Sequence, residues 1–185
     1  IAFLMNEAKK MKINVLPPDI NKSSVYFTPE EKNIRFGLLA IKNVGLNLVN
    51  AIIEQRLRFG PFKDFSDFIT RIEHKDLNKK SLESLIKAGV FDSLDIDRNI
   101  LLTNIEEIIS FRQTNKKNSL MQNSLFGSNY SNGNNILKPK SAEPISKKEK
   151  LNWEKQLLGL YISGHPLDEY IDKIKGGWTD IDVIV

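Results

Sequence analysis

Two stretches decide the fold: Ile41-Lys42-Asn43-Val44-Gly45 and Ile86-Lys87-Ala88-Gly89-Val90. They begin about 45 residues apart, and each starts with an apolar residue and a lysine. Each also interrupts a helical spacing of apolar residues with a glycine. That spacing runs to about Arg58 after the first stretch, precedes the second from Leu77, and resumes over Arg98 to Phe111. The pattern predicts two units of helix, glycine-containing break and helix.

Each break is a candidate phosphate-binding site of the helix-hairpin-helix type. The helix after a short hairpin presents unpaired backbone N–H groups and the positive end of its dipole, where a phosphate docks without contacting a base. We expect Ile41 and Val44 to fix the first hairpin to the core, while Gly45 permits close approach and positive φ. The candidate DNA-binding residues are Lys42, Asn43, Val44, Gly45, Leu46, Asn47, Lys87, Ala88, Gly89 and Val90.

A structural role is the alternative interpretation of both glycines, because glycine commonly ends a helix as its C-cap. The repeated apolar–Lys start favours phosphate binding, which would be independent of base sequence.

The net charge of +4 is concentrated in one stretch. Arg112 to Lys150 contains eight Lys and Arg against two Glu, whereas the other residues sum to −2. The same stretch has seven Asn and six Ser with almost no apolar periodicity, which is typical of a flexible basic linker. The folded parts must therefore bind DNA through local geometry and a few placed cations.

An apolar pair stands inside this linker, in Gln122-Asn123-Ser124-Leu125-Phe126. Adjacent Leu and Phe with no core to join favour a partner's pocket. A Gln three and four residues ahead of such a pair is the pattern of sliding-clamp ligands, so the candidate clamp-binding residues are Gln122, Ser124, Leu125 and Phe126. The alternative is a linker turn that folds back on the domain.

The other elements predict a mainly α fold with a short β-hairpin near the N-terminus. Residues 13–16 are expected to be extended, and Val25–Thr28 and Asn33–Phe36 to pair as the hairpin. A stripe of aromatic and branched residues from Phe62 to Ile72 predicts a buried helix face. Helical periodicity returns over Lys147 to Leu160.

Composition excludes several classes of function. The chain has 185 residues, 41% of them hydrophobic, and no cysteine, which excludes disulfides, thiolate zinc sites and cysteine nucleophiles. It lacks an apolar run long enough to span a bilayer and an h-region, so we expect no membrane association and a cytoplasmic location. The abrupt start at Ile1 and the apolar end at Asp182–Val185 suggest an interior segment of a longer protein.

Catalytic chemistry is not expected within the segment. Asp95-Ile96-Asp97 and Asp180-Ile181-Asp182 resemble paired metal-binding aspartates, but the first pair is better explained as helix capping. His165 before Pro166 is expected to make a structural turn bond. We therefore assign no catalytic residue, no metal ligand and no cofactor to this segment.

Four blocks together resemble the alpha subunits of bacterial DNA polymerase III. These are Val15–Asn21, which contains LPPDIN, Ile34–Gly45, Leu82–Asp92 and Leu157–Leu167. They occur in the family's order, and the resemblance that they carry covers nearly the whole chain. Asn43 and Lys12 stand where the family usually has glycine, and Asn tolerates positive φ better than most residues.

The resemblance implies that the chain is divided into four segments. Residues 1–36 would end the polymerase fingers, 37–111 would form a tandem helix-hairpin-helix domain on duplex DNA, and 112–150 would be the linker with the clamp-binding motif. Residues 151–185 would lead into an OB-fold domain. The parent would be a DNA-directed DNA polymerase, a nucleotidyltransferase that uses Mg through upstream residues, with the β sliding clamp and other replicase subunits as partners.

Two other functions, and one paralogue of the polymerase, are also compatible with the sequence. A non-catalytic helix-hairpin-helix module of DNA repair would use the same hairpins without a polymerase, and a helical scaffold would not bind DNA at all. An error-prone paralogue of the polymerase is a further possibility, although the Gln122 to Phe126 motif favours the replicative form.

Overall fold

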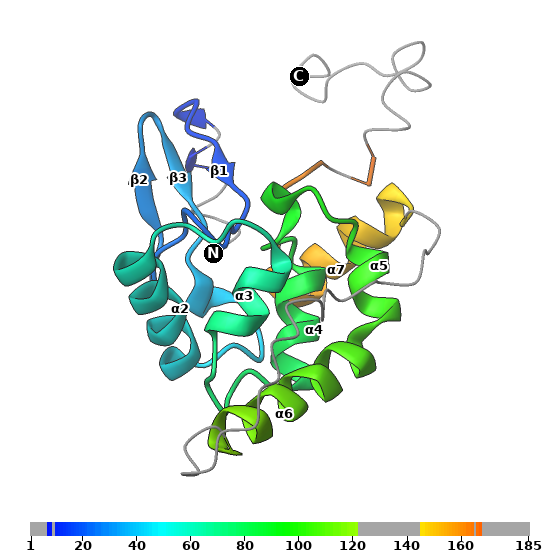
Figure 1. The fold of residues 1–185 in the computed structure, drawn as a ribbon. Helices are drawn as coiled ribbons and strands as arrows, with labels where there is room; N and C mark the ends of the chain where they lie inside the picture. Colours follow the sequence, from blue (N-terminus) through cyan, green and yellow to red (C-terminus); the bar gives the residue numbers. More distant parts are fainter. Residues whose placement is uncertain (1–6, 9, 122–144, 165, 168–185) are drawn as a thin grey trace, which may run out of the picture.

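The structure is a computed structural model that describes residues 7–8, 10–121, 145–164 and 166–167. Helices dominate these residues, and a small sheet lies near the N-terminus, so the predicted fold class is confirmed (Figure 1). The elements in chain order are β1 (Val15–Leu16), β2 (Thr28–Glu30), β3 (Asn33–Arg35), η1 (Leu38–Ala40), α2 (Leu46–Phe59), α3 (Phe65–Arg71), α4 (Lys79–Lys87), η2 (Asp92–Leu94), α5 (Arg98–Thr103), α6 (Ile105–Met121) and α7 (Lys147–Leu158).

The sheet has the order β1-β3-β2. Strands β2 and β3 pair antiparallel in a hairpin, but its first strand is Thr28–Glu30 and not the predicted Val25–Thr28, and the turn places Glu31 at φ 57°. The extended segment before Pro17 becomes β1, which pairs parallel to β3. Arg35 donates two hydrogen bonds to the Glu30 carboxylate at 2.7 Å, and these bonds lower the pKa of Glu30. The ion pair thereby joins the two strands of the hairpin.

The loop between β1 and β2 ties this sheet to the helices. Its turn is held by Asp19, whose carboxylate accepts from the amides of Asn21 and Lys22. Ile20 is fully buried, and its amide donates to the carbonyl of Val90 at 2.9 Å. The N-terminal segment therefore shares one apolar core with the helices.

Aromatic rings form the centre of that core. Phe62, Phe65 and Phe68 are buried as predicted, and Phe91 joins them, with ring centroids 4.8 Å apart for Phe68 and Phe91. The edge-on geometry of these rings adds to the stabilisation from their burial. The helical stripe is core rather than a platform for bases.

The last predicted helix differs from the prediction in two respects. One helix was expected from Arg98 to Phe111, whereas α5 and α6 are separated at Asn104. The buried Asn104 side chain donates to the carbonyl of Ile100 at 2.7 Å, a local bond that competes with the helix ladder. Helix α6 then continues to Met121, so the first ten residues assigned to the linker are helical.

Candidate nucleic-acid interface

The first corner, residues 41–45, joins η1 to α2. Ile41 and Val44 are buried in the core, as predicted, while Lys42, Asn43 and Gly45 are exposed. The left-handed residue is Asn43, at φ 66°, and not Gly45, whose φ is −89°. The expectation that Gly45 supplies positive φ is therefore wrong. The Asn43 amide also donates to the hydroxyl of Ser84 on α4 at 3.0 Å, which fixes the corner to a second helix.

The N-terminus of α2 is open to solvent beside this corner. Gly45 is its N-cap, with no side-chain cap, and the first turn has no acidic residue. A Cβ at Gly45 would meet no atom within 4 Å. Among the described residues, none accepts a hydrogen bond from the amides of Leu46, Asn47 or Leu48. These amides and the helix dipole make a positive, accessible end of a 14-residue helix.

The second corner, residues 86–90, has the opposite character. Ala88, Gly89 and Val90 are buried, and Gly89 has φ 80°. Their amides donate, in order, to the carbonyls of Ser84, Ile86 and Leu85. The short η2 follows this corner, and α5 begins only at Arg98, where the Asp97 side chain already caps it. No α-helix therefore starts directly at the second corner, as α2 does at the first.

An ion pair between buried Arg98 and half-exposed Asp92 fills the space over Gly89. The Arg98 side chain, 7% exposed, donates to both carboxylate oxygens of Asp92 and, at 2.9 Å, to the carbonyl of Lys87. A Cβ on Gly89 would lie 2.7 Å from the Arg98 guanidinium carbon. The side chain of Lys87 is engaged too, at 2.6 Å from Glu83. The second corner thus already contains a cation and its counter-ion.

The structure therefore brings part of the predicted set to one exposed place: Lys42, Asn43, Gly45, Leu46 and Asn47. Val44 is buried in the core. In the second corner, Ala88, Gly89 and Val90 are buried as well. Direct phosphate contact at Ala88 to Val90 stays a prediction that this geometry does not favour. Sequence reasoning did not find Arg98 and Asp92, because their contact spans the turn between η2 and α5, which apolar periodicity does not describe.

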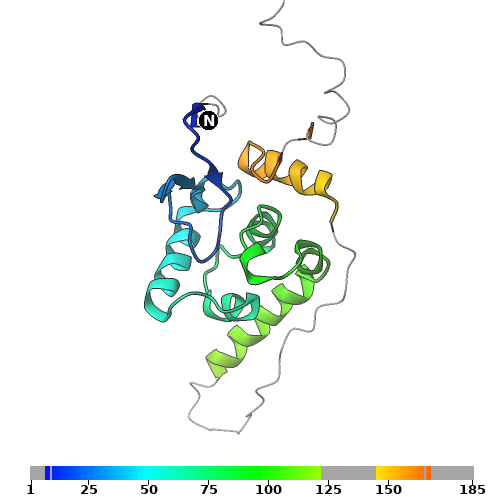
Figure 2. The ribbon, with the colours of Figure 1, turned by 90° about the horizontal axis from the view of Figure 1, so that it is seen from above.

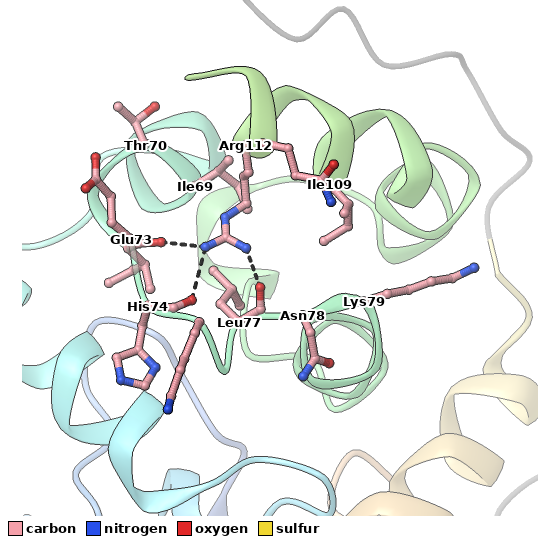
Figure 3. A pocket seen from close by; sticks show the side chains of 12 residues that line it. Ile69, Thr70, Glu73, His74, Leu77, Asn78, Lys79, Ile109 and Arg112 are labelled. Carbon is pink, nitrogen blue, oxygen red and sulfur yellow. Dashed lines mark hydrogen bonds between the residues drawn. The ribbon is translucent and has the colours of Figure 1, made fainter. Parts of the chain in front are cut away.

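An open pocket of about 710 Å³ lies between the α3–α4 loop and α6 (Figure 3). At its centre, Arg112 donates to the carbonyls of Ile72, His74 and Leu77. Burial lowers the pKa of Arg112. The rim carries Glu73 as well as lysines. The Arg112 guanidinium is already bonded to carbonyls of the α3–α4 loop, so we do not assign a second phosphate site to this pocket.

The remaining sequence signals are structural or lie outside the described residues. Asp97 is the N-cap of α5, as expected, whereas Asp95 is the C-cap of the preceding η2. The part of the chain that the structure describes contains no cluster of acidic and histidine side chains able to hold a metal, and none of its helices could cross a membrane. The candidate clamp-binding residues Gln122, Ser124, Leu125 and Phe126 fall outside that part, as do His165 and Asp180–Asp182.

Comparison with known proteins agrees with this geometry. A family model described as the helix-hairpin-helix motif matches residues 12–101, the part of the chain that contains both corners. DNA polymerase III subunit alpha of Borreliella burgdorferi is 43% identical over 175 residues, covering 92% of the chain and 15% of that protein. The same-named subunits of Aquifex aeolicus and Mycobacterium tuberculosis are 41% and 40% identical, over 97% and 90% of the chain and 14% of each relative.

The chain belongs to the DNA polymerase III alpha subunit family and spans about 15% of the length of these relatives.

The two corner glycines predict opposite responses to alanine. Gly89→Ala forces positive φ on a residue with a Cβ and pushes against Arg98, so unfolding free energy should fall by at least about 2 kcal/mol. Gly45→Ala has room and an ordinary φ, so the loss should stay below about 1 kcal/mol. Urea unfolding of the two variants measures the difference, and equal losses would contradict the contrast between corners.

Proposed function

We propose that the chain binds the backbone of double-stranded DNA, without sequence preference, through its first corner. One observation carries the proposal: α2 begins in solvent with no side-chain cap and no acidic residue in its first turn. Most helices satisfy these amides with their own side chains, as Asn78 does for α4 and Ser146 does for α7. An uncapped start beside a lysine is suited to an external anion.

The surroundings of the corner support this assignment. Burial of Ile41 and Val44 and the bond from Asn43 to Ser84 hold the backbone rigid before any ligand arrives. Rigidity matters because amides that need no rearrangement lose little entropy on binding. Lys42 is exposed and forms no ion pair with any described residue, so its charge is available to a neighbouring phosphate.

The second corner serves this proposal indirectly. The ion pair of Arg98 with Asp92 locks the end of α4 at Lys87, and α4 carries the Ser84 that holds Asn43. The two glycine corners then have different tasks, with one binding the phosphate and the other holding the helix behind it.

The proposal extends to the longer protein that the relatives suggest. We infer that the parent is a DNA-directed DNA polymerase whose catalytic, Mg-binding residues lie upstream, and that this segment grips the product duplex. Residues Gln122 to Phe126 would bind the β sliding clamp, and other replicase subunits would bind elsewhere. The identity to polymerase subunits covers residues well beyond the helix-hairpin-helix match, which disfavours a separate DNA-repair module.

Asn47 provides a sharp test of phosphate binding at α2. Asn47→Asp places a carboxylate in the first turn, where it favours the helix but repels a phosphate. We expect unchanged or higher thermal stability together with duplex affinity about tenfold lower, measured by fluorescence anisotropy at low salt.

Asn50→Asp is the matched control, because Asn50 is also exposed on α2 but lies beyond the first turn. It adds the same charge, so the loss of affinity should be several-fold smaller. Equal losses in the two variants would mean that charge in general, and not the helix start, governs binding. The affinity of the unmodified chain for duplex DNA should also fall steeply as salt concentration rises, and it should not depend on base sequence.

The clamp contact is tested separately. Replacing Leu125 and Phe126 with Ala removes the apolar pair of the proposed motif, so binding to an immobilised β clamp should be lost. Duplex affinity should change less than about twofold, because no charge is altered. Loss of both activities together would contradict the division between corner and motif.

A further inference from the structure

Helix α7 returns to the two glycine-containing corners from far along the sequence. It begins at Lys147, beyond the residues that the helix-hairpin-helix family matches, yet it packs beside α4 (Figure 2). Leu151, Leu158 and Leu160 are buried, and the last two belong to the main core. The helix and the turn after it are therefore part of the same folded unit as the corners.

The C-terminal end of α7 contacts the first corner directly. The amide of Lys42 donates to the carbonyl of Leu157 at 3.1 Å. Carbonyls in the last turn of a helix have no partner within the helix, so this bond satisfies one of them. The same bond fixes the backbone of the corner three residues before Gly45.

The middle of α7 contacts the second corner. The ammonium group of Lys87 lies 5.6 Å from the centre of the Trp153 ring, within the range of a cation–π interaction. One helix thus touches both glycine-containing corners, and it does so from the side of α4.

A buried carboxylate holds the turn that ends α7. Glu154 is 3% exposed, and one of its oxygens accepts from the amides of Ile162 at 2.8 Å and Ser163 at 3.0 Å. These bonds draw the chain back after Gly159, which has φ 77°, and allow Leu160 to enter the core. Hydrogen bonds to a charged acceptor are roughly twice as strong as neutral ones. Glu154 therefore contributes strongly to holding the turn after the C-terminus of α7 in place.

We propose that α7 braces the first corner and that Glu154 is the positioning residue of this brace. The inference rests on the proposed function and deepens it, because the DNA-binding unit then includes residues 146–163 in addition to 37–111. The segment with the candidate clamp-binding motif becomes an insertion within one unit, with a helix of that unit on each side.

The experiment compares three variants of the whole chain. Glu154→Ala removes the acceptor, Glu154→Gln keeps a neutral acceptor, and Glu149→Ala alters the distant N-terminal cap of α7. Both alanine variants remove one negative charge, so their general electrostatic effects on DNA binding match. Readouts are the hydrogen-exchange rate of the Lys42 amide in the free chain and the dissociation constant for a short duplex.

Glu154→Ala should speed exchange at Lys42 about tenfold or more and weaken duplex binding about tenfold, since a charged hydrogen bond contributes on that order. Glu154→Gln should restore most of both values, and Glu149→Ala should leave both within about twofold of the unmodified chain. If Glu154→Ala does not fold, Glu154→Asp replaces it, because its shorter carboxylate should give a smaller shift in the same direction.

Failure of the brace and failure of the proposed function give different results. Unchanged exchange at Lys42 in Glu154→Ala would overturn the brace, whatever the affinity for DNA. Equal effects of Glu149→Ala and Glu154→Ala would overturn the role of Glu154. If the unmodified chain does not bind duplex DNA, the proposed function is wrong, while faster exchange in Glu154→Ala alone still supports the brace.

Discussion

The proposed contact with DNA depends on the unpaired amides at the start of α2. A helix start with no cap is unfavourable unless water or a ligand satisfies it. Here the surrounding structure keeps it exposed: Ile41 and Val44 are drawn into the core, and Asn43 accepts positive φ and bonds to α4. The N-terminus of α2 is therefore rigid and positive, on a folded unit whose net charge is small. On such a unit, phosphate affinity depends on this local geometry more than on overall charge.

The two corners show how similar sequence can take different roles. Both start with an apolar residue and a lysine and contain a glycine, but only the first is followed at once by a long helix. At the second, Arg98 reaches back over Gly89 and meets Asp92, so the ligand position is filled by the protein itself. The glycine is needed there for space and backbone shape, which are requirements of folding.

Apolar periodicity was sufficient to predict the helices, the hairpin and the aromatic core, because these features depend on local patterns. Features that depend on long-range contacts were not predictable. The positive φ of Asn43 agrees with its place at a family glycine position, but its bond to Ser84 on another helix was not predictable. The break at Asn104 comes with a side-chain bond to the carbonyl of Ile100 that apolar periodicity does not register, and Glu154 acts through amides eight and nine residues ahead. Each requires knowledge of the packed neighbours.

The most direct measurement is a titration of the ¹⁵N-labelled chain with a short DNA duplex, followed by amide chemical shifts. The account predicts the largest shifts at Gly45 to Leu48, with Lys42 affected and Ala88 to Val90 nearly unchanged. Shifts that are absent from the first turn of α2, or larger at the enclosed corner than at the open one, would contradict it.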